Sequence, residues 1–190
     1  MKFLTDQEVF SFLNALNMHI APWGDIKNIS DKITDTHSVT FNVASDENES
    51  CRVGQLLSEW VKPGEWVICK FDNSNCLAHW QWAVLLATNA ALSPGKVKYA
   101  AENQNQSILM EFDSSWCSKI KLSIFIGNLI AFGAHAHIVS KGATERQLLS
   151  IQDGCVFFEA TRMEVEVARK MLANHLNNKT MLPDWLFKPD

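Results

Sequence analysis

The side chains best suited to chemistry in this chain are one cysteine and two histidines. Cys76 follows Ser74 and Asn75, either of which can cap a helix, and it opens a mostly apolar stretch that runs to Leu92. A thiol in the first turn of a helix feels the positive end of the helix dipole, which lowers its pKa and favours the nucleophilic thiolate. The sequence therefore marks Cys76 as a candidate nucleophile.

The two histidines, His135 and His137, follow a segment with the pattern of a β-hairpin. Apolar residues alternate with polar ones before it, at Ile120, Leu122, Ile124 and Ile126. Gly127-Asn128 suits a two-residue type II′ turn, and residues 129–139 would return as the second strand. Because side chains alternate across a strand, both imidazoles are expected on the apolar, inward face of that hairpin.

The chain order of these residues resembles that of papain-like cysteine amidases and peptidases. Those enzymes present the nucleophile at the start of a helix packed on a sheet, and their general base is a histidine from a later strand. The resemblance implies a thiol-dependent amide hydrolase with Cys76 as nucleophile and His135 or His137 as base. No third residue that would orient the base is identifiable, and core histidines satisfied by backbone or hydroxyl groups are the structural alternative.

Acidic and tryptophan residues favour binding over catalysis. Residues 1–95 carry six basic and eleven acidic side chains, with a local cluster at Asp46, Glu47 and Glu49. Three tryptophans fall in expected loops or near the termini: Trp23, Trp116 and Trp185. Acidic faces speed association with basic partners, and tryptophan is frequent at binding hot spots. The leading hypothesis is a non-catalytic binding protein, an acidic antagonist or immunity-type inhibitor of a toxin or another enzyme; the alternative for the cluster is a solvated loop.

Composition narrows the class of protein. The 190 residues include 17 Lys and Arg against 21 Asp and Glu, and the net charge of −4 argues against a nucleic-acid binder. The five cysteines form no C-x-x-C pair, and the His-x-His pair lacks a third ligand at suitable spacing, so we expect neither disulfides nor a metal. Phosphate-binding and dinucleotide-binding motifs are missing, and we expect no cofactor. The start of the chain lacks a signal-peptide pattern and no apolar stretch is long enough to span a bilayer, which predicts a cytoplasmic protein.

Hydrophobic periodicity predicts the elements that would position these residues. Capping boxes and apolar stripes indicate helices at 6–17, from Ser50 to Pro63, from Thr144 onward and from Thr161 to about 176. Residues 76–92 are apolar on all sides of a helical wheel, as in a central, buried helix. Strands are expected at 39–43, 66–71, 96–99, 108–112 and 155–159. The sequence predicts one α+β domain over residues 1–190, with a largely antiparallel sheet, a central buried helix and several amphipathic helices.

Overall fold

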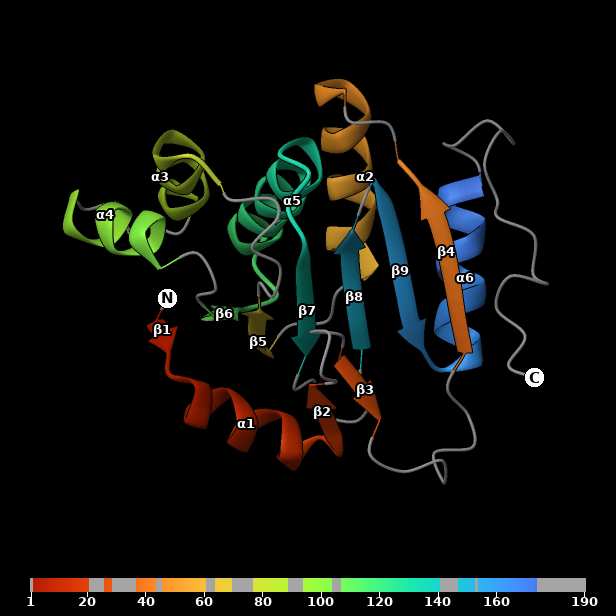
Figure 1. The fold of residues 1–190 in the computed structure, drawn as a ribbon. Coiled ribbons are helices and arrows are strands. Elements are labelled where there is room, and N and C mark those ends of the chain that lie inside the picture. The colour runs from red at the N-terminus through yellow and green to blue at the C-terminus, as the bar shows by residue number, and fades with distance from the viewer. Residues whose placement is uncertain are drawn as a thin grey trace.

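An antiparallel sheet of seven strands organises the chain (Figure 1). The computed structural model describes residues 2–20, 26–28, 37–43, 46–60, 64–69, 77–88, 94–103, 107–140, 147–152 and 154–173. In spatial order the strands are β1 (Lys2–Leu4), β6 (Ser107–Phe112), β5 (Gly64–Cys69), β7 (Ala136–Ser140), β8 (Gln147–Gln152), β9 (Cys155–Ala160) and β4 (His37–Asn42). A separate hairpin pairs β2 (Met18–Ile20) with β3 (Ile26–Asn28). Every neighbouring pair is antiparallel, so the predicted α+β class with an antiparallel sheet is confirmed.

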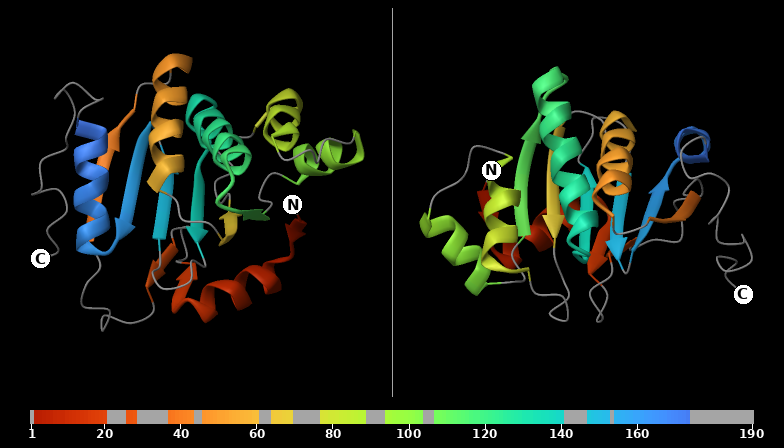
Figure 2. Two further views of the ribbon diagram at one scale, coloured as in Figure 1. Left: turned by 180° about the vertical axis from the view of Figure 1, so that it is seen from behind. Right: turned by 90° about the horizontal axis from the view of Figure 1, so that it is seen from above.

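The two faces of the sheet are covered differently. The helices in the described ranges are α1 (Asp6–Ala15), α2 (Glu47–Trp60), α3 (His79–Ala87), α4 (Pro94–Glu102), α5 (Trp116–Ala131) and α6 (Arg162–Ala173). Helices α2, α5 and α6 lie together on one face, and α3 and α4 continue that layer beyond α5 (Figure 2). On the other face, Val9 and Leu13 of α1 form a smaller core with Val139 of β7 and Leu148 of β8.

Helices α2 and α5 pack unusually closely because a glycine on each leaves room for the other backbone. A Cβ on Gly54 would lie 2.5 Å from the carbonyl oxygen of Ser123 and 2.7 Å from the backbone nitrogen of Gly127. A Cβ on Gly127 would lie 3.2 Å from the carbonyl oxygen of Ser50. Because Gly54 meets Ser123 and Ser50 meets Gly127, the two helices run antiparallel.

Helix α5 replaces the expected hairpin, which was wrong. Gly127 and Asn128 lie inside the helix, and a glycine that was expected to form a turn instead permits contact with α2. The helix begins at the cap Ser115, whose Oγ accepts a hydrogen bond from the Ser118 backbone N–H at 3.2 Å. It ends at Ala131 with Phe132 as its C-cap, and Gly133, the next residue, has a φ of +60°, the left-handed conformation typical of the residue after a helix. The central buried helix is therefore α5, and not residues 76–92.

Three other predicted elements also differ. Residues 96–99 belong to helix α4, where Val97 and Ala100 point inward at helical spacing, and not to a strand. The helix expected from Thr144 and Gln147 is wrong where the structure describes it, because residues 147–152 form β8. Ser50 lies within α2 instead of capping it, since that helix begins at Glu47. The other helices begin as predicted, with Thr5 and Thr161 each bonded to a glutamate three residues later.

Candidate functional site

The two candidate histidines lie at β7, on the sheet face turned away from α2 and α5. His137 faces Ser150 across the β7–β8 pair, and Ser150 in turn faces Phe157 of β9. The Nδ1 atom of His137 and the Oγ atom of Ser150 are 2.7 Å apart, within hydrogen-bonding distance. His135, just before the strand, His137 and Ser150 are 8%, 9% and 8% exposed. The described partner of His137 is thus a buried hydroxyl on the neighbouring strand.

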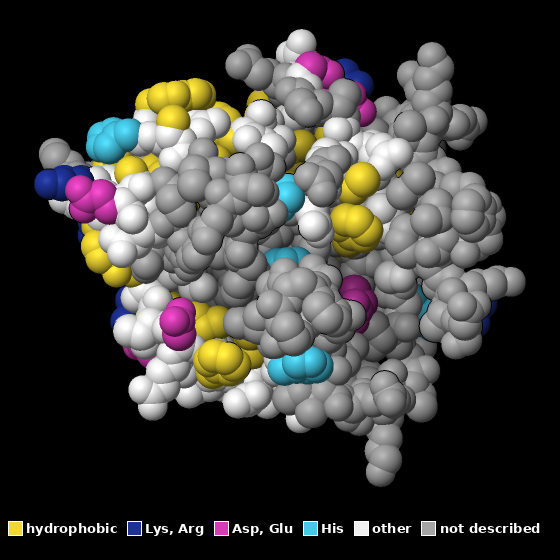
Figure 3. All heavy atoms as spheres, in the orientation of Figure 1, with side chains coloured by type: hydrophobic (Ala, Val, Ile, Leu, Met, Phe, Trp, Pro, Cys, Tyr) yellow, Lys and Arg dark blue, Asp and Glu magenta, His cyan; other side chains and the backbone are white. Residues whose placement is uncertain are grey.

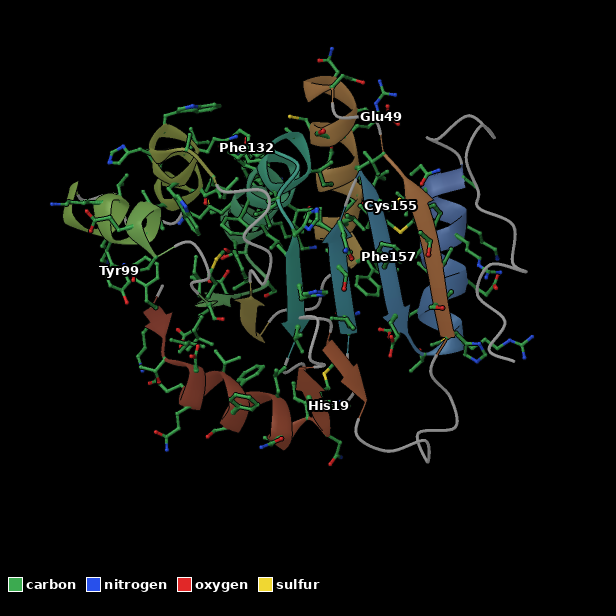
Figure 4. All side chains as sticks on the ribbon, in the orientation of Figure 1. His19, Glu49, Tyr99, Phe132, Cys155 and Phe157 are labelled. Carbon is green, nitrogen blue, oxygen red and sulfur yellow. The ribbon has the colours of Figure 1, made fainter. Side chains whose placement is uncertain are left out.

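A second polar pair lies one step along the same face. Cys155 of β9 is opposite Asn42 of β4, and its Sγ donates a hydrogen bond to the Asn42 Oδ1 at 2.9 Å. Figure 4 shows Cys155 and Phe157 on β9, the strand next to the edge strand β4. This contact links β9 to the edge strand β4 through two side chains.

The candidate nucleophile Cys76 lies outside the described residues. Helix α3 begins at His79, and the side chain of Gln81 accepts a hydrogen bond from the Ala78 backbone N–H at its start. The expected helix start at Cys76 is therefore wrong. Because α3 begins three residues later, its dipole gives no reason to expect a lowered pKa for the Cys76 thiol. The pairing of Cys76 with His135 or His137 stays a prediction.

The acidic cluster forms the start of helix α2. Asp46 precedes the helix, and its Oδ1 accepts a hydrogen bond from the Glu49 backbone N–H at 3.0 Å, as an N-cap does. Asp46 is exposed and Glu49 is partly exposed; Glu47 belongs to the same turn, but its side chain lies outside the description. Negative charge at this position is favourable for the helix dipole, so Asp46 has a structural role while its side chain remains exposed.

Aromatic side chains of α3 and α5 lie at the same end of the helix layer as the acidic start of α2. Because α2 and α5 are antiparallel, Phe132 at the end of α5 lies at the same end of the helix layer as Glu49 (Figure 4). Phe132 meets Trp80 of α3 edge to face, with ring centroids 5.3 Å apart, and Trp80 is 60% exposed. Figure 3 shows hydrophobic side chains over α3 and, over the start of α2, acidic side chains with a basic one beside them. We call Asp46, Glu49, Trp80 and Phe132 the helix-end surface.

The sequence-predicted tryptophans do not join this surface. Trp116 is 76% exposed, as its expected loop position would suggest, but it starts α5 and lies about 24 Å along the helix from Phe132 at 1.5 Å per residue. Trp23 and Trp185 lie outside the described residues. Trp80 was not predicted as a surface residue, because α3 has no Asp, Glu, Lys or Arg that would indicate which of its sides faces solvent. The signal was the helical spacing of Trp82, Leu85 and Leu86, which leaves Trp80 and Val84 on the opposite side.

Within the described ranges, no three His, Cys, Asp or Glu side chains gather closely enough to hold a metal ion. In the same part of the chain, no helix combines the length and the apolar character needed to cross a bilayer. Comparison with protein-family models, curated proteins and solved structures finds no match.

Proposed function

We propose that this chain is a cytoplasmic binding protein, an antagonist or immunity-type inhibitor of a toxin or another enzyme, that docks a basic protein partner on its helix-end surface. The observation that carries the proposal is the exposure of Trp80. Tryptophan is a large, mostly apolar side chain that proteins usually bury extensively, yet Trp80 is 60% exposed. Its ring meets Phe132 edge to face, so a partner would meet two adjacent aromatic side chains.

Charge and aromatic character together favour a cationic partner group. The carboxylates of Asp46 and Glu49 attract Lys and Arg side chains over long range and raise the association rate. The exposed face of Trp80 binds the same cations through its π-electrons, and tryptophan is among the residues that contribute most to binding energy at interfaces. Helix α3 carries no Lys or Arg side chain that would repel such cations.

Affinity capture with matched variants tests the proposal. The wild-type chain, Trp80→Ala, the double variant Asp46→Asn with Glu49→Gln, and Met163→Ala are immobilised and exposed to lysate of the source cells. Asparagine keeps the N-cap hydrogen bond while it removes the charge of Asp46. Met163, which is 72% exposed on α6, is the control for loss of an exposed apolar side chain outside the surface.

We expect one basic protein to bind the wild type and Met163→Ala equally. Trp80→Ala should weaken that binding by about 30-fold, which corresponds to about 2 kcal/mol at a hot spot. The charge-neutral variant should lower the association rate and make it less sensitive to salt. Equal capture by all four proteins would place the binding elsewhere and overturn the proposal.

A second candidate function is the thiol-dependent amide hydrolase with Cys76 as nucleophile. One observation favours it: His137 is buried and already holds a side-chain oxygen at its Nδ1, as a general base does. This function predicts that Cys76 reacts with iodoacetamide faster than free cysteine does at neutral pH. Labelling at or below the rate of free cysteine would remove it.

A further inference from the structure

The hydrogen-bonded pair Ser150 and His137 is placed where water competes weakly for it. Two strand positions away on the same face, Val139 and Leu148 belong to the core under α1 and are 0% and 6% exposed. Hydrogen bonds in apolar surroundings are stronger than in water, and a proton moves more readily between groups that are already aligned. The binding function proposed above makes no use of this pair.

The same face is more open toward β9. Phe157, directly opposite Ser150, is only partly buried, and so is Gln152, two residues along β8. Ser150 itself keeps 8% of its surface accessible. Any approach of a small reagent to the hydroxyl is therefore from the β9 side.

We propose that Ser150 and His137 form a nucleophile and general-base pair that accepts small acyl groups from activated esters. In the first step the Ser150 Oγ forms a bond to the carbonyl carbon, and its proton passes to the His137 Nδ1. The ester bond then breaks, the leaving alkoxide takes that proton, and an acyl-serine remains. Water attacks the acyl carbon with the same proton transfers in reverse order, which releases the acid and restores both side chains.

The proposed reaction requires both side chains of the pair. Serine is a weak nucleophile unless an adjacent base removes its proton, so the rate of attack depends on the imidazole as much as on the hydroxyl. The Oγ of Ser58 provides the contrast, since it is also buried but donates to the carbonyl oxygen of Gln55 at 2.7 Å, a group that cannot take its proton. Ser150, and not Ser58, should react with reagents that trap activated serines.

The test uses a fluorophosphonate probe on the intact chain, with the site of modification mapped by mass spectrometry of peptides. A fluorophosphonate loses fluoride when the serine oxygen bonds to its phosphorus, so each adduct records one nucleophilic attack. We expect a single adduct on Ser150, none in Ser150→Ala, a rate at least about 100-fold lower in His137→Gln, and an unchanged rate in Ser58→Ala. Circular dichroism confirms that each variant is folded.

Two results would overturn the inference. One is a folded wild-type chain that shows no adduct on Ser150 after hours with millimolar probe. The other is an adduct that forms as fast in His137→Gln, or in urea-unfolded chain, as in the folded wild type. Peptide mapping of the wild type and the comparison with unfolded chain decide the question even where a variant does not fold.

Discussion

Trp80 and Trp82 lie two residues apart on α3 and face opposite environments. Trp82 is 2% exposed in the main core, whereas Trp80 is 60% exposed at the helix-end surface. The sequence predicted both as core because the segment is apolar on every side. A helix without charged residues does not reveal which of its sides meets solvent, so only the structure separates the two roles.

The two tryptophans should therefore respond differently to truncation. Trp82→Ala removes a buried ring and should lower the free energy of unfolding by about 3–5 kcal/mol. Trp80→Ala should lower it by less than about 1 kcal/mol, since it loses one edge contact with Phe132 and little burial. Urea denaturation of both variants measures the difference, and a large loss in Trp80→Ala would mean that this ring is structural.

Glu8 provides a pH-dependent contact at the start of α1. Hydrogen bonds from the Lys2 ammonium and from the Thr5 backbone and hydroxyl lower the pKa of Glu8 from 4.5 to about 2. Because the folded pKa lies below the unfolded one, the stabilisation is fully present above about pH 4.5 and is lost as the pH falls toward 2.

Glu8→Gln should thus be less stable than the wild type at neutral pH, and the gap should close between pH 4.5 and 2. Glutamine keeps the length of the side chain and its capping contact while it removes the charge. Denaturation of both proteins across this pH range measures the gap. A gap that does not change with pH would show that the ionised form of Glu8 contributes nothing.

At the scale of elements, α5 has the hydrophobic period of a helix, whereas the period of a strand was predicted there. Ile120, Leu122, Ile124 and Ile126 fit the two-residue period of a strand. The inward residues of the helix follow the helical spacing instead: Leu122, Phe125, Ile126, Leu129 and Ile130. Ser115 and Gly133 also stand where a helix cap and stop belong. The helix was thus predictable once the stretch was taken as one element, but Gly127-Asn128 favoured a turn.

Because α2 and α5 are in close contact, adding one methyl group at Gly54 should lower the free energy of unfolding. Gly54→Ala would push a Cβ into the backbone of Ser123 and Gly127, which cannot move aside as a flexible side chain can. We expect a net loss of about 1–3 kcal/mol in the free energy of unfolding, although alanine favours a helix by about 1 kcal/mol over glycine.

Gly95→Ala is the matched control for this substitution. A Cβ at Gly95 of α4 meets nothing within 4 Å, so alanine there should be neutral or stabilising by up to about 1 kcal/mol. The two variants are compared by thermal or urea denaturation. A Gly54→Ala variant as stable as Gly95→Ala would contradict the packing of α2 against α5.

For the whole molecule, the fold class was predictable although several elements were not. The strands β4, β6 and β9 were expected because they combine β-branched and aromatic residues with alternation, as at Val39 and Phe41. Strand β8 was not, because its residues are covered on both faces, by the helices at Leu149 and by α1 at Leu148. A strand covered on both sides has no alternation to detect.

The candidate site was harder to predict from the sequence than the fold class, because it depends on how separate elements pack. The acidic residues were found from the sequence, since charge density needs no fold. Trp80 and Phe132 come from other helices, and only the antiparallel packing of α2 and α5 places Phe132 at the same end of the helix layer as Glu49. The pairing of His137 with Ser150 likewise follows from the β7–β8 register, which was not predicted because a helix was expected from Thr144 onward.

Site-specific photo-crosslinking in the source cells tests the central claim, that a basic partner docks on the helix-end surface, most directly. A benzophenone amino acid replaces Trp80 in one protein and Met163, exposed on α6, in a control. The account predicts a crosslink from position 80 to one basic protein, which disappears when Asp46→Asn and Glu49→Gln are added, and no such crosslink from position 163. A partner that crosslinks equally from both positions, or from position 163 alone, would contradict it.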